Sequence, residues 1–200
     1  MEIEELFLKK IIISFLMFLI ILVTFNSNTK VQAMSYQKGD IFITSSVGSS
    51  GKGIVGHTGI VVGENLILHT SGWKNEPYPK LIKIKVSKNS KETSWFKRYP
   101  KTKVARPNSK HLGKLAAKNA MKYFKGKRIH YRISPNPKDI TRTYCSELVW
   151  YAYYKSGKTY KIQSYFQNPK FVTPSIIKPY EFSNKKYLKY NSFKLVDKKW

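Results

Sequence analysis

The segment GHTGIVVGENLILHTSG, residues 56–72, carries two runs of apolar side chains on either side of the turn residues GEN at 63–65. Apolar runs that flank a short turn predict a β-hairpin, with His57 in one strand and His69 in the other. A three-residue loop at 63–65 sets both imidazoles on one side of the sheet, because side chains alternate along a strand. A two-residue loop at 64–65 sets them on opposite sides. The sequence leaves both turns open.

The rest of the chain predicts a mixed fold in which strands precede helices. Apolar or alternating runs predict strands at IFIT (41–44), LIKIKV (81–86) and KTKVARP (101–107), with a small-residue loop at 45–53. Amphipathic runs predict one helix that begins after a cap at Asn108 or Ser109 and ends at Gly126, and a second from Tyr144 to about Gly157. The tail predicts one or two short strands among turns. Strands clustered before helices indicate an α+β class and argue against alternating βαβ units.

Residues 1–33 have the pattern of an export signal. Lys9 and Lys10 precede an apolar run at 11–25, and the segment ends in a small-x-small sequence at 31–33. We expect cleavage near Ala33, a single mature domain at 34–200, and a secreted or cell-envelope protein. The apolar run is also near the lower length limit for a spanning helix, so an uncleaved membrane anchor is the alternative.

The formal net charge is +26, and residues 1–33 contain three lysines against three glutamates, so the mature chain keeps that charge. Such a charge attracts anions over long range, and we expect anionic wall polymers or an anionic lipid surface as partners. The lysines are spread along the chain without the regularly spaced aromatics of a nucleic-acid module, so we expect no nucleic-acid partner. A solvated basic surface without a dedicated partner explains the charge equally well.

Cys145 is the only cysteine in the chain. It cannot form an internal disulfide, and the periodicity places it in the first turn of the second helix, where backbone N–H groups favour a thiolate. A cysteine in an apolar helix is otherwise a core residue. With histidines in the same chain it suits nucleophilic catalysis, with His57 as base and His69 holding the tautomer of its ring. The remaining histidines, His111 and His130, are expected on the surface.

Three phrases in this order, GDIFIT (39–44), GHTGIVVGENLILHTSG (56–72) and YCSELVWYAYYKSG (144–157), resemble the permuted papain-like cysteine hydrolases. These are relatives of the NlpC-type cell-wall peptidases and include the YiiX-like and YycO-like amidases and the lecithin retinol acyltransferase group. The resemblance implies Cys145 as nucleophile, His57 as base and His69 at the third polar position. It also implies an antiparallel sheet of about five strands packed against the N-terminal part of the cysteine helix.

An oxyanion hole is expected from the backbone N–H of Cys145 and one tyrosine hydroxyl. Tyr144 is the first choice, and Tyr131 in the preceding loop is the other. Glu147 is left out of the site because helix capping and the helix dipole explain an acid in the first turn. Trp73 lies in a loop at 71–80 that is expected to line the pocket, where it either covers substrate or packs on the core.

These observations predict an exported cysteine amidase or peptidase that cleaves an acyl bond, most readily an amide of a cell-wall peptide or a related small amide. The first alternative is a lipid acyl hydrolase or acyltransferase that uses the same site. The second is a non-catalytic basic module that adheres to the wall or membrane. No cofactor or metal is expected, because one cysteine and four scattered histidines provide no cluster at ligand spacing.

Overall fold

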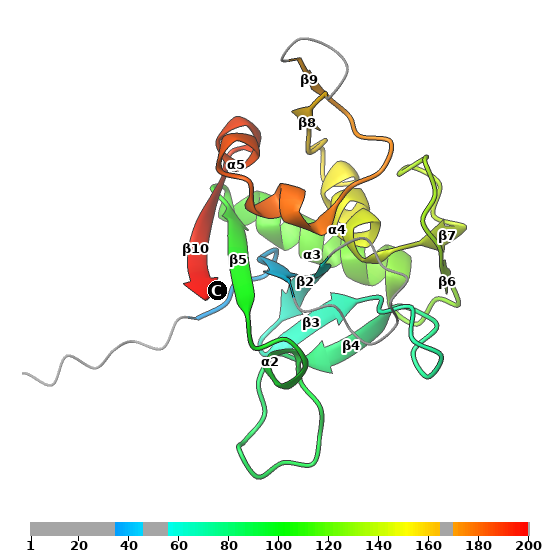
Figure 1. The fold of residues 1–200 in the computed structure, drawn as a ribbon, viewed down its shortest axis with the longest axis vertical. Helices are drawn as coiled ribbons and strands as arrows, with labels where there is room; N and C mark the ends of the chain where they lie inside the picture. The colour runs from blue at the N-terminus through cyan, green and yellow to red at the C-terminus, as the bar shows by residue number, and fades with distance from the viewer. Residues whose placement is uncertain (1–34, 46–55, 165–169, 200) are drawn as a thin grey trace, which may run out of the picture. The chain divides into compact units, whose positions relative to one another are not determined.

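The computed structural model describes residues 35–45, 56–164 and 170–199 of the chain (Figure 1). From Tyr36 onward the described residues belong to one compact unit. The expected export signal lies outside the described residues, and so does most of the expected loop at 45–53. Within the described part, no helix combines the length and the apolar character that crossing a bilayer requires.

A six-stranded antiparallel sheet forms the centre of this unit, in the order β10-β5-β1-β2-β3-β4. Its strands are β1 (Ile41–Thr44), β2 (His57–Gly63), β3 (Leu66–His69), β4 (Lys80–Lys83), β5 (Thr102–Pro107) and β10 (Phe193–Lys199). The α+β class is confirmed. The sheet has six strands, where the sequence predicts about five. The additional strand is β10, which comes from the end of the chain and pairs with β5.

The hairpin of β2 and β3 combines features of the two turns that the sequence leaves open. Next to the turn, Gly63 pairs with Leu66, which is the two-residue register, and Asn65 has a left-handed backbone (φ 53°). Between Val61 and Gly63 the register shifts by one residue, so that Gly59 pairs with His69 as a three-residue loop requires. This bulge therefore sets His57 and His69 on the same side of the sheet.

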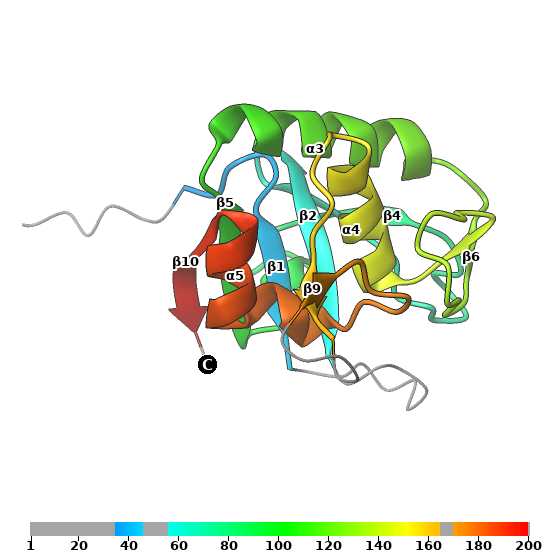
Figure 2. The ribbon, with the colours of Figure 1, turned by 90° about the horizontal axis from the view of Figure 1, so that it is seen from above.

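The two faces of the sheet are covered differently. On one face α3 (Lys110–Phe124) and α4 (Cys145–Tyr154) lie side by side (Figure 2) and form the larger core with β1 and β2 residues such as Ile60. On the other face the short helix α2 (Trp95–Arg98) forms a smaller core with Phe42 and Val61. Ser109 caps α3 as expected, because its Oγ accepts the N–H of Leu112 at 3.2 Å.

Smaller elements complete the unit. A parallel pair, β6 (His130–Tyr131) and β7 (Arg142–Thr143), leads directly into α4. After α4 come β8 (Ile162–Gln163), β9 (Phe171–Val172), the 3₁₀ helix η1 (Pro179–Ser183) and α5 (Lys185–Asn191). The β6–β7 pair brings Tyr131 alongside Thr143, close to the start of the cysteine helix.

Candidate active site

His57 and His69 form a buried pair at one end of the β2–β3 hairpin. Nε2 of His57 lies 2.9 Å from Nδ1 of His69, a hydrogen bond whose direction depends on the tautomer. The His57 ring stacks on Trp95 and is tilted against Tyr99, with ring centroids 5.4 and 5.1 Å apart. These aromatic contacts hold the imidazole in one orientation, on the α2 side of the sheet.

Both imidazoles are poor bases in this environment. Burial lowers the pKa of His57 well below its ordinary value, and the nearby His69 and Arg98 lower it further. Burial also lowers the pKa of His69 to about 4, although the negative charge of Glu76 acts in the opposite direction. Both rings are therefore neutral at neutral pH.

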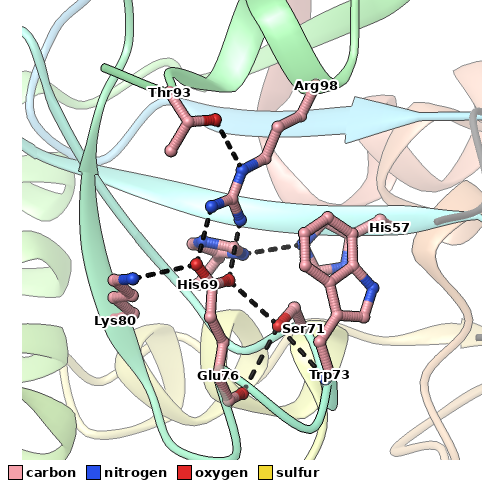
Figure 3. A network of polar contacts seen from close by, with 8 residues as sticks. All are labelled: His57, His69, Ser71, Trp73, Glu76, Lys80, Thr93 and Arg98. Carbon is pink, nitrogen blue, oxygen red and sulfur yellow. Dashed lines mark hydrogen bonds and ion pairs between the residues drawn. The ribbon is translucent and has the colours of Figure 1, made fainter. Parts of the chain in front are cut away.

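A charged network built around Glu76 supports the histidine pair (Figure 3). Arg98 donates two hydrogen bonds to the Glu76 carboxylate, at 2.7 and 2.6 Å, and Lys80 and the Ser71 hydroxyl donate at 3.0 and 3.2 Å. Burial alone would raise the pKa of Glu76, but the hydrogen bonds from Arg98 and Lys80 outweigh it and hold that pKa at about 2. A carboxylate that stays ionised therefore lies within electrostatic range of His69.

Cys145 begins α4, and its side chain is almost completely buried, at 2% exposure. Oγ of Ser146 lies 4.0 Å from its sulfur. Burial raises the pKa of the thiol, and the backbone N–H of Thr58, Ser146 and the Tyr131 hydroxyl act in the opposite direction and only partly offset the effect. The resting site thus holds a neutral thiol.

Strand β2 links the thiol to the histidine pair, because Thr58, whose backbone N–H lowers the pKa of the Cys145 thiol, directly follows His57. The side chains approach this point from opposite faces: α4 packs on one face of the sheet, while the imidazoles contact Trp95 on the other. No hydrogen bond of the described residues joins Sγ of Cys145 to an imidazole nitrogen. Catalytic hydrogen bonds are often long in free enzymes and tighten only when substrate binds.

The tyrosine hydroxyl at the thiol belongs to Tyr131. Its ring is held against Gly72, where an added Cβ would lie 2.8 Å from the ring and where the backbone has φ +70°. Tyr144, the first choice from the sequence, is fully buried, and its hydroxyl accepts the backbone N–H of Ile177 at 2.9 Å. Tyr144 therefore ties the start of α4 to the segment before η1.

The other residues singled out in the sequence lie around this centre. Glu147 is fully buried, and burial raises its pKa to about 8, although the backbone N–H of Tyr144 opposes the shift. His111 is exposed, and His130 is exposed with its ring edge-on to Tyr78. The Arg98 guanidinium stacks over the Trp73 ring, with Cζ 4.8 Å from the ring centroid, so Trp73 packs against the Glu76 network.

Sequence reasoning does not find Glu76, Arg98 or Tyr99. Glu76 lies in an irregular loop, and Arg98 and Tyr99 lie at the end of a four-residue helix, so neither segment has a periodic pattern. The contact between Glu76 and Arg98 joins residues that no local motif connects. Only the tertiary fold brings these residues close to the histidine pair.

Among the described residues, no group of three or more His, Cys, Asp or Glu side chains is arranged to hold a metal ion. No protein-family model and no curated protein matches the chain. Among solved structures, the chain is similar to the crystal structure of metalloprotein YiiX from Escherichia coli O157:H7. The TM-score is 0.48 and the identity 19%, over 84% of this chain and 99% of that one. A similarity this low assigns neither a function nor a site.

Proposed function

We propose that this protein is an exported cysteine hydrolase that cleaves an acyl bond, with Cys145 as nucleophile, His57 as base and His69 as the residue that orients the base. The observation that carries the proposal is the arrangement at the start of β2. The backbone N–H of Thr58 lowers the pKa of the only thiol of the chain, and His57, the residue before it, is fixed by His69 through its Nε2.

This hydrogen bond determines which nitrogen does the chemistry. With Nε2 of His57 held by His69, Nδ1 is left to take the thiol proton as Sγ attacks the substrate carbonyl carbon. The base therefore has to be the Nε2–H tautomer, which donates to Nδ1 of His69. The same Nδ1 then returns the proton to the leaving amine, and the thioester is hydrolysed by water that His57 deprotonates.

Negative charge would accumulate on the carbonyl oxygen in both steps. The backbone N–H of Cys145 lies at the N-terminus of α4, and the Tyr131 hydroxyl is a donor that lowers the pKa of the thiol. We assign the oxyanion hole to these two donors. Because the thiol is 2% exposed, substrate reaches it only if a neighbouring side chain moves.

Glu76 is a positioning residue in this scheme. When His57 takes the thiol proton, the positive charge is shared with His69, and the ionised Glu76 stabilises it through space. Arg98 and Lys80 fix the carboxylate so that it cannot rotate away. Glu76 raises the pKa of both imidazoles, against the lowering that burial and Arg98 cause.

An amide of a cell-wall peptide, or a related small amide, is the substrate class we favour, because an export signal at 1–33 delivers the enzyme to the envelope. A lipid acyl ester is the second candidate, since the thiol is surrounded by aromatic residues, Tyr99, Tyr131 and Tyr144, in a strongly basic protein. Both substrates pass through a thioester on Cys145.

The test is a digestion of purified wall fragments and a phospholipid panel by the wild-type protein and by Cys145→Ala, with products read by mass spectrometry. We expect the wild type to release wall peptide and Cys145→Ala to release none. An acyl adduct on Cys145 with phospholipid, without wall cleavage, would move the assignment to lipid. Equal product from both proteins, or none from either, would refute the catalytic proposal.

A further inference from the structure

The outer face of α3 carries a line of lysines. Lys110, Lys114, Lys118 and Lys122 recur every four residues, which is about 6 Å along a helix axis, and Lys125 follows at the C-cap. All five are exposed, while the opposite face of α3 packs into the core through small residues such as Ala116 and Ala120. Figure 2 shows α3 along the outer edge of the described unit. We call these five residues the lysine ridge.

Nothing in the described part of the chain neutralises the ridge. α3 contains no acidic residue, and none of the ion pairs among residues 35–45, 56–164 and 170–199 involves a lysine of α3. Like charges four residues apart repel each other, and Lys110 lies at the positive end of the helix dipole. Helix stability therefore does not explain the pattern.

The ridge leads towards the candidate active site. After Lys125 the chain continues through the exposed Lys127 and Arg128 and reaches Tyr131, which pairs with Thr143 just before Cys145. A chain of anionic groups lying along α3 would thus extend to the thiol. No lysine of the ridge is part of the proposed catalytic machinery, and the role of the ridge does not depend on the proposed catalysis.

We propose that the lysine ridge is a docking surface for a linear phosphodiester polymer. Ammonium groups bind phosphates as point charges, and a single row of them on one helix matches anionic groups that recur along one chain. A lipid surface fits less well. Anchoring helices insert large apolar side chains, and the exposed large hydrophobics of the described residues, Leu66, Ile176 and Tyr190, all lie off α3.

The experiment measures binding of a poly(glycerol phosphate) chain to the purified protein over a series of salt concentrations. The ridge variant is Lys114→Gln with Lys118→Gln. The control is Lys185→Gln with Lys189→Gln, which removes the same charge at the same spacing from the exposed face of α5. Each phosphate contact on a flexible single chain contributes about 0.7 to the slope of log affinity against log salt, so the ridge variant should lower that slope by about 1.4.

We expect the control to keep the wild-type slope, and both variants to keep the wild-type rate of Cys145 alkylation, which shows that the fold is intact. Equal weakening of binding in both variants would mean that net charge alone attracts the polymer, and would overturn the proposal. So would a ridge variant that binds the polymer normally but loses binding to phosphatidylglycerol vesicles. If the ridge variant alone loses polymer binding, and neither the wild type nor any variant has hydrolase activity, then the docking proposal stands and only the catalytic proposal is refuted.

Discussion

At the scale of single residues, the candidate site consists of a neutral thiol and a neutral imidazole pair. Burial raises the pKa of Cys145 and lowers those of His57 and His69, so an ion pair between thiolate and imidazolium is disfavoured before substrate binds. The thiol proton then moves only as the carbon–sulfur bond forms. Such a site keeps the thiol unreactive until a carbonyl occupies the oxyanion hole.

The alkylation rate of Cys145 tests this resting state. The thiolate is the reactive form, and the folded pKa of the thiol is raised, so alkylation by iodoacetamide should be slow at neutral pH. It should keep rising beyond the pH at which an ordinary thiol levels off, which is more than one unit above the ordinary thiol pKa of about 8.5. The rates are read by mass spectrometry against a small free thiol. A plateau on the acid side of neutrality would show a preformed ion pair and contradict this description.

Variants of Tyr131 and Tyr144 distinguish an effect on catalysis from an effect on stability. Tyr131→Phe removes a hydroxyl that lowers the thiol pKa, so alkylation should slow, and turnover of the substrate should fall by about a hundredfold if an oxyanion donor is lost. Tyr144→Phe leaves the buried N–H of Ile177 without its acceptor and should lower the free energy of unfolding by about 1–3 kcal/mol. The assignment is wrong if Tyr144→Phe slows alkylation and Tyr131→Phe does not.

At the scale of elements, part of the site follows from local sequence and part does not. The histidines can be placed on adjacent strands because the turn at 63–65 is readable, and Ser109 marks the start of α3 by its capping chemistry. The register bulge beside Gly63 is not readable, although it decides which side of the sheet His57 faces. The pairing of Glu76 with Arg98 depends on how two irregular segments cross, which local propensities do not encode.

The Glu76 network joins the β3–β4 loop to α2, and its two cations should differ in importance. Arg98 has a side chain only 12% exposed, so Arg98→Gln leaves a buried carboxylate poorly compensated and should cost roughly 3 kcal/mol. Lys80 is 50% exposed, and Lys80→Gln should cost less than about 1 kcal/mol. Urea unfolding of both variants provides the comparison.

The same pair of variants has a second readout. Arg98 lowers the pKa of His69 and Glu76 raises it, so Arg98→Gln should move the His69 pKa upward from about 4, as followed by NMR. Lys80 also lowers the pKa of His69, but its effect is smaller than that of Arg98, so Lys80→Gln should give the smaller shift. Equal stability losses with an unmoved His69 pKa would mean that the network is only a surface cluster.

At the scale of the whole described unit, the candidate site depends on how closely α3 docks on the face of the sheet. Gly39, just before β1, and Gly113, in the first turns of α3, lie in direct backbone contact: a Cβ on Gly39 would lie 2.3 Å from Cα of Gly113. Gly39 also has φ +92°, which disfavours other residues. Two isolated glycines in the sequence give no sign of this contact, because their partners are far apart along the chain.

Gly113→Ala tests this contact, because local propensity and packing predict opposite signs. In an exposed helix the change would add about 1 kcal/mol of stability. Here the new Cβ would lie 2.6 Å from the carbonyl oxygen of Lys38 and 3.2 Å from Cγ of Pro107, so α3 must move away from the sheet, and we expect a loss of about 1–3 kcal/mol.

Gly126→Ala is the control, since Gly126 has φ +69° and an added Cβ there would have nothing within 4 Å. This variant should lose about 1 kcal/mol through backbone strain alone. Only Gly113→Ala should also change the alkylation rate of Cys145, because α3 packs directly on α4. A stabilised Gly113→Ala protein in urea unfolding would show that α3 does not dock this closely.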